Sequence, residues 1–136
     1  MPTITESYLG GLRVECVHEQ SGTKLVTDAP TDNKGKGESF SPTDLLATAL
    51  ASCAITTMGI YADAHGLDVS GATLSATKTM AANPRRISSI EVILKMPDRD
   101  YTEKQKKSLE NAARACPVHH SLHPDMEKKL TILWAR

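Results

Sequence analysis

Residues 41–58 read SPTDLLATALASCAITTM, and this stretch decides the fold. The opening Ser-Pro pair supplies an N-cap and a first helical residue, and Asp44 places a carboxylate in the first turn. Small and apolar side chains then continue most of the way round until Gly66, the residue type that commonly ends a helix. The pattern predicts a helix over 42–65, about 36 Å long and buried on nearly all sides. A small domain cannot easily surround such a helix, so we expect a second copy of the chain to cover it.

The segments on either side of this helix predict strands and one more helix. Before it, two alternating segments joined by Ser21-Gly22 indicate a hairpin over 4–29, followed by a Gly- and Lys-bearing loop over 30–41. After it, the predicted elements are strands over 68–80 and 86–97, a second helix over 102–116 and a last strand over 128–134. The chain is therefore expected to form a single α+β domain over 1–136. Its antiparallel strands would pack on the long central helix and on the second helix.

Composition excludes several classes of protein. The 16 Lys and Arg residues balance the 16 Asp and Glu residues, so the basic excess typical of nucleic-acid binding is absent. The N-terminus has no basic start followed by an apolar run, and hydroxyl groups interrupt the apolar stretch of the long helix. We therefore expect a cytoplasmic protein that binds neither nucleic acid nor a membrane. In that compartment, a disulfide among the three cysteines is expected to be transient and catalytic.

The three cysteines differ in their surroundings. Cys53 lies in ALASCAITTM, where small polar neighbours suit a thiolate, although free cysteine is also a common core residue. Cys116 lies in ARACPVHHSLHP, at the end of the predicted second helix, where the helix dipole disfavours a thiolate. This makes Cys116 the better resolving thiol, or else a packed residue at a helix end. Cys16, flanked by valines in the hairpin, is expected to be structural.

A zinc site is the metal alternative. Cys116 is followed by His119, His120 and His123, and both residue types are zinc ligands. No second pair of such residues elsewhere completes a four-ligand set. A histidine-bearing surface loop is the preferred interpretation, and we predict no metal.

Several segments together resemble the OsmC/Ohr family. SPTDLLATALASCAITTM is similar to the family's stretch around its reactive cysteine, and ARACPVHHSL is similar to its second motif, a helix that ends in Cys-Pro. GGLRVECVHEQSGTKLVTDAP and NPRRISSIEVILKMP also resemble the OsmC-like branch. The resemblance covers nearly the whole chain, in order. It implies an intertwined homodimer in which the long helix is buried.

The resemblance also implies a function, the thiol-dependent reduction of a small-molecule hydroperoxide, expected to be organic. Cys53 would attack the O–O bond and become a sulfenic acid, and Cys116 would condense with it to a disulfide. An external dithiol, lipoyl or thioredoxin-like, would then reduce the disulfide, and no cofactor is needed. The alternatives are a non-catalytic dimeric ligand-binding protein of the same fold, and the zinc-bound Cys/His site.

In the family an arginine activates the nucleophile and a glutamate holds the arginine. Arg13 lies on the hairpin region that supplies the arginine, whereas Arg85 and Arg86 beside a turn proline are expected to be solvated. The acidic residue at the head of the helix is Asp44, nine positions before Cys53, whereas the family's glutamate stands ten positions before.

Nine helical steps would place Asp44 on the face opposite Cys53. Either the helix bends, or Asp44 serves the other subunit's site, or it is only a charge that favours the helix dipole. Glu38 in the preceding loop is an alternative carboxylate.

Overall fold

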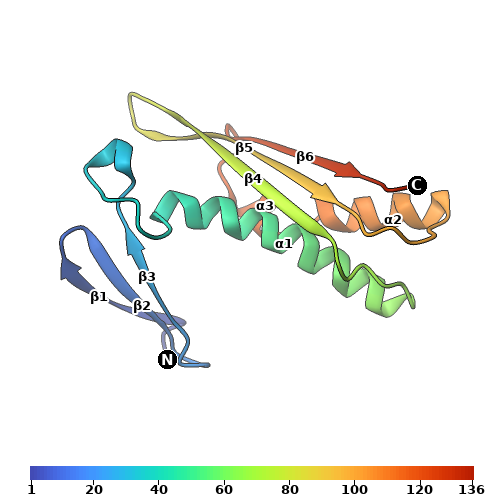
Figure 1. The fold of residues 1–136 in the computed structure, drawn as a ribbon, viewed down its shortest axis with the longest axis horizontal. Helices are drawn as coiled ribbons and strands as arrows, with labels where there is room; N and C mark the ends of the chain where they lie inside the picture. The colour runs from blue at the N-terminus through green and yellow to red at the C-terminus, as the bar shows by residue number, and fades with distance from the viewer. The chain divides into compact units, whose positions relative to one another are not determined.

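The computed structural model describes residues 1–136, which form two compact units, Met1–Leu46 and Ala47–Arg136. Figure 1 shows the order of the elements along the chain. The N-terminal unit contains one three-stranded sheet, and the C-terminal unit contains a second sheet with its helices. The helix α1 (Pro42–Ala64) begins in the first unit and continues in the second.

The N-terminal sheet is an antiparallel meander of three strands in the order β1-β2-β3. Its strands are β1 (Ile4–Gly10), β2 (Arg13–His18) and β3 (Lys24–Asp28), and the 3-10 turn η1 (Thr31–Asn33) follows. The expected hairpin over 4–29 is therefore wrong in detail, because its first strand is two strands. Gly10 and Gly11 have φ angles of 79° and 62°, which a turn can use and a strand interior cannot.

The C-terminal sheet has the order β4-β5-β6 and is mixed. Its strands are β4 (Thr73–Ala81), β5 (Arg86–Lys95) and β6 (Glu127–Leu133). β4 and β5 are antiparallel as expected, but β6 runs parallel to β5. The parallel pairing follows from the connection between them, which contains α2 (Glu103–Arg114) and α3 (Pro117–Ser121) and is long enough for a crossover.

The core of the C-terminal unit lies between this sheet and the helices. Alternate residues of β5 face it, and Ile90, Val92 and Leu94 are almost completely buried. Ile90 and Val92 pack with residues of α1 such as Ala51. Leu94 packs with Ala54 of α1 and with Leu109 of α2. One buried face of the sheet thus supports both helices, which gives a two-layer α+β unit.

Element bounds differ most from expectation around Cys116. The predicted second helix over 102–116 ends at Arg114, and a separate five-residue helix, α3, starts at Pro117. Proline at this position begins a helix, because its missing N–H is not needed in the first turn. The predicted strand over 68–80 also starts later, at Thr73, because the Asp68 carboxylate accepts the Ser70 N–H in a turn.

One protomer covers only one face of α1, whereas the sequence predicted burial on nearly all sides. Met58 and Ala62 are fully buried, but Ile60, on the same turn, is 67% exposed. By length and composition α1 is the one helix in the structure that could span a membrane, a test that core helices of soluble proteins also pass.

Candidate active site

Cys53 lies in the middle of α1 and is half-buried. It packs at the edge of the core cluster that contains Leu50, Ala51 and Cys116. One helical turn onward, the Thr57 hydroxyl lies 3.9 Å from the Cys53 sulfur. The residue thus combines partial access with a polar neighbour, as a reacting thiol requires.

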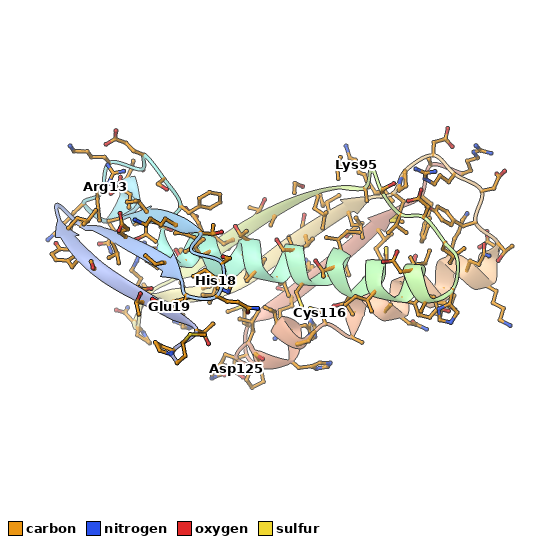
Figure 2. The ribbon with its side chains drawn as sticks, turned by 90° about the horizontal axis from the view of Figure 1, so that it is seen from below. Arg13, His18, Glu19, Lys95, Cys116 and Asp125 are labelled. Carbon is orange, nitrogen blue, oxygen red and sulfur yellow. The ribbon has the colours of Figure 1, made fainter.

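Cys116 occupies the junction between α2 and α3, as Figure 2 shows. Its side chain is only 1% exposed. Its sulfur caps α3 by accepting a hydrogen bond from the backbone N–H of His119, at 3.3 Å. The sequence argument placed Cys116 at a helix C-terminus, where the dipole opposes a thiolate. That argument is wrong, because Cys116 is an N-cap and faces backbone donors.

The two sulfurs are hydrogen-bond neighbours, and Cys53 is the better thiolate. Burial raises the pKa of Cys53, but the backbone N–H of Val118 and the Cys116 and Thr57 side chains donate to its sulfur. Together these hydrogen bonds bring the pKa of Cys53 below its usual value. Cys53 therefore carries more thiolate near neutral pH than an ordinary cysteine does.

Cys116 shows the opposite shift. Burial is the largest cause that raises the pKa of Cys116, and the interaction with Cys53 adds to it. The hydrogen bond from His119 N–H only partly opposes these effects. The pair is thus asymmetric, with a thiolate-prone sulfur on α1 beside a protonated one on the cap of α3.

The histidines after Cys116 do not form a metal site with it. No three His, Cys, Asp or Glu side chains in the structure converge on a point where they could hold a metal ion. Burial lowers the pKa of His119, and the neighbouring Lys128 and His120 lower it further. His123 is exposed and faces Asp125. The zinc alternative gains no support.

Arg13 and Glu38 form an ion pair within the N-terminal unit, with Arg13 Nη1 3.5 Å from Glu38 Oε1 (Figure 2 shows Arg13). Arg13 lies on β2 opposite Asp28 of β3. Asp28 is buried, and its Oδ2 atom accepts the backbone N–H of Glu38 at 3.0 Å. The loop that carries Glu38 is therefore held by a buried carboxylate.

Asp44 makes the contacts of a helix cap. The Ser41 N–H donates to Asp44 Oδ2 at 2.9 Å, and the Asp44 N–H donates to Ser41 Oγ at 3.1 Å. This reciprocal pair is a capping box, formed here with Asp in place of the more usual Glu or Gln. These contacts hold the Asp44 carboxylate at the N-terminus of α1, where a negative charge is favoured by the helix dipole.

The remaining candidates, Cys16 and Arg86, make local contacts within their own units. The Cys16 sulfur lies 3.6 Å from the Glu6 carboxylate, and burial together with this negative charge raises the pKa of Cys16. A raised pKa disfavours the Cys16 thiolate, which is the reactive form of a cysteine. Arg86 is exposed and donates to the carbonyl groups of Ala82 and Pro84, so it closes the turn between β4 and β5.

The sequence argument missed the backbone donors of α3. The N–H group of Val118 lowers the pKa of both sulfurs, and that of His119 lowers the pKa of Cys116. Pro117 was the available signal, because a proline after a helix end can be the first residue of another helix. The backbone of Val118 and His119, whose role the sequence did not indicate, thus completes the surroundings of the two sulfurs.

Comparisons with known proteins agree with this architecture. The sequence profile described as OsmC-like protein matches residues 35–131. A search of the curated proteins found no match.

Solved structures give the same result over the whole length. An osmotic stress induced and detoxification response protein of Psychrobacter arcticus is 46% identical, with a TM-score of 0.92, over 97% of this chain and 96% of that one. An organic hydroperoxide resistance protein OsmC of Legionella pneumophila superposes with a TM-score of 0.75 at 16% identity, over 98% of each chain. One of Elizabethkingia anophelis gives 0.74 at 17% identity, over 98% of this chain and 96% of its own.

The expected α+β fold of the OsmC/Ohr type is confirmed by these superpositions. The matched profile covers both the segment that contains Cys53 and the one around Cys116. The chain belongs to the OsmC/Ohr family, which includes organic hydroperoxide resistance proteins.

Proposed function

We propose that this protein is a thiol-dependent hydroperoxide reductase, with an organic hydroperoxide as substrate and Cys53 and Cys116 as the reacting pair. The observation that carries the proposal is the hydrogen-bonded, asymmetric pair of sulfurs. A purely structural pair needs no lowered pKa, whereas a peroxidatic thiol does.

The proposed reaction begins at Cys53. Its thiolate attacks one peroxide oxygen, the O–O bond breaks, and the alkoxide leaves as the alcohol after it takes a proton. Cys53 becomes a sulfenic acid, and Cys116 attacks its sulfur with loss of water to give a disulfide. Because the two sulfurs are already neighbours, this closure needs little movement of the chain.

Regeneration then requires an external dithiol, lipoyl or thioredoxin-like, and no resident cofactor or metal. Such a dithiol attacks the Cys53–Cys116 disulfide and returns both thiols. The cytoplasm would supply it, and this is the compartment that we propose for the protein. A homodimer is part of the proposal, because one protomer leaves the Ile60 side of α1 open.

Arg13 is proposed as the activating cation and Glu38 as its positioning carboxylate. The Arg13–Glu38 ion pair supports this choice, since a carboxylate that orients the guanidinium is what the mechanism needs. Asp44, the acidic residue expected from its place at the head of the helix, is the alternative, and its capping contacts make it the weaker one.

A non-catalytic ligand-binding protein of the same fold is the rival proposal. It predicts that the three thiols survive hydroperoxide treatment, because binding alone oxidises nothing. The asymmetric sulfurs favour the enzyme.

Thiol titration with peptide mapping tests the proposal. One equivalent of an alkyl hydroperoxide should remove two of the three thiols and leave a Cys53–Cys116 linked peptide, with Cys16 still free. The Cys16→Ser protein is the control and should behave in the same way. Survival of all thiols, or a disulfide that includes Cys16, would refute the proposed reaction.

A further inference from the structure

A second feature of the C-terminal unit is a cavity that reaches Cys116 but not Cys53. Its volume is about 220 Å³, and Cys116 is among the residues that line it whereas Cys53 is not. Because Cys116 is only 1% exposed, this cavity is the approach by which a small reagent could meet its sulfur. At about 30 Å³ per water molecule, the space would hold roughly seven water-sized groups, enough for a short-chain molecule.

The cavity is lined by both apolar and basic residues. Its apolar lining includes Leu50 of α1, Val92 of β5 and Leu130 of β6. Three cationic residues also line it, namely Arg114, Lys128 and Lys129, and no aspartate or glutamate does.

The three cationic side chains differ in the contacts that they already make within the protein. Lys129 pairs with Glu127 at 3.3 Å, and the Lys128 ammonium donates to two backbone carbonyl groups. Arg114, the last residue of α2, is exposed, and its side chain makes no ion pair or hydrogen bond. Its charge is therefore the one most available to a ligand.

We propose that this cavity receives the reducing thiol, that the thiol is a short-chain compound carrying a carboxylate, and that it attacks Cys116 rather than Cys53. The inference rests on the proposed function, because it concerns the disulfide which that reaction leaves. A hydroperoxide in the same cavity would meet the resolving sulfur, so the cavity suits the reductive step and not the oxidative one.

The step balances as a thiol–disulfide exchange. The thiolate of the reductant attacks Cys116 Sγ, the S–S bond breaks, and its electron pair leaves on Cys53 Sγ as a thiolate. A second thiol then attacks the reductant's sulfur in the mixed disulfide, which releases the oxidised reductant as its disulfide and returns Cys116 as a thiol after it takes a proton. Attack in this direction also gives the better leaving group, since the sulfur with the lower pKa leaves faster and the pKa of Cys53 is the lowered one.

The test uses the whole protein with its disulfide formed by an azo thiol oxidant, so that no peroxidase activity is required. The disulfide is reduced with 3-mercaptopropionate, 3-mercaptopropanol or cysteamine, which are anionic, neutral and cationic thiols, and each rate constant is divided by the thiolate fraction. We expect the anionic thiol to react about tenfold faster than the neutral one at low salt, and the cationic thiol to be slowest. Added salt should shrink the difference.

Arg114 provides the decisive variants. Arg114→Gln should lower the anionic-to-neutral ratio about twofold to fivefold, while Arg114→Lys should keep it. Lys107→Gln, which removes an exposed charge elsewhere on α2, is the matched control and should change nothing. The neutral thiol is an internal control in every variant, because damage to the fold would change its rate as well.

The site of attack is read separately, by acid quenching and peptide mapping of the mixed disulfide. The thiol should be found on Cys116. A ratio near one, a ratio unaffected by Arg114→Gln, or a thiol bound to Cys53 would overturn the inference. A disulfide that forms with the azo oxidant but not with hydroperoxide would refute the proposed function alone, and failure to form it with either would refute both.

Discussion

In the proposed mechanism, Thr57 and the first residues of α3 decide which of the two sulfurs attacks the peroxide. Cys53 lies in an apolar helix, where burial alone would raise its pKa, yet the pKa is lowered because donors from two different elements reach its sulfur. The polar neighbours on α1 were visible in the sequence, because Thr57 follows Cys53 by one helical turn. The Val118 N–H was not, since a backbone donor leaves no residue-type signal and depends on where α3 lies.

Thr57→Val tests this account at the level of one hydroxyl group. The thiolate of Cys53 is present above its lowered pKa and is lost as pH falls through that pKa. In the variant the pKa of Cys53 is higher, so as pH falls the peroxide reactivity should disappear sooner than in the wild type. At pH 6 the first-turnover rate should fall roughly threefold to tenfold, for a hydrogen bond worth about 1 kcal/mol, and at high pH the rates should converge. Rapid-mixing rate measurements across pH would check this.

Thr56→Val is the matched control, because this substitution removes the same hydroxyl group at an exposed neighbouring position. The Thr56→Val protein should show the same pH dependence of the first-turnover rate as the wild type. Identical profiles for wild type and Thr57→Val would show that the hydroxyl does not act on Cys53.

At the scale of elements, local signals predicted α1 and β5 well and the surroundings of Cys116 poorly. Ser-Pro, a carboxylate in the first turn and the terminal glycine predicted the bounds of α1 to within one residue. The expected range was 42–65, and the observed helix is Pro42–Ala64. α3 was missed because Cys-Pro was interpreted only as a helix end. The parallel pairing of β6 was missed because strand direction depends on the crossover and not on the strand's own residues.

Of the two acidic residues near the start of α1, we expect Asp44 to act as a helix cap and Glu38 to position Arg13. Asp44→Ala should lower the free energy of unfolding by about 1 kcal/mol and leave the peroxide rate of the folded protein unchanged. Glu38→Gln should lower that rate roughly tenfold to hundredfold through misplacement of Arg13, with recovery in Glu38→Asp. Denaturant titrations and first-turnover rates measure the two effects.

Glu15→Gln is the control for these variants, since Glu15 also pairs with a cation, Lys24, at 3.9 Å on the same sheet. It should change the free energy of unfolding by no more than a few tenths of a kcal/mol, about the worth of an exposed ion pair, and should leave the peroxide rate unchanged. A rate loss in Asp44→Ala with none in Glu38→Gln would return the positioning role to Asp44.

At the scale of the whole molecule, the exposed face of α1 is the feature on which the proposed homodimer rests. The sequence predicted a helix buried nearly all round, and one protomer buries only the side that carries Met58 and Ala62. Hydrophobicity reports that a surface will be covered, but not by which chain, so the dimer stays a prediction.

Sedimentation of wild type and of Ile60→Lys tests the assembly. The wild type should sediment at about twice its chain mass of 14.7 kDa at micromolar concentration, because an exposed apolar helix face favours association. Ile60→Lys should shift it toward the monomer, while Asn111→Lys, which adds the same charge at an exposed position of α2, should not. A stable wild-type monomer would contradict the predicted dimer.

The central claim is that Cys53 attacks and Cys116 resolves, and the most direct test is a single turnover of the two serine variants followed by sulfenic acid trapping. Cys53→Ser should consume no hydroperoxide, because no sulfenate can form. Cys116→Ser should complete one turnover, give a trappable sulfenic acid on Cys53, and then stall or over-oxidise in excess peroxide. If Cys116→Ser showed no first turnover while Cys53→Ser still reacted, the assigned roles would be reversed.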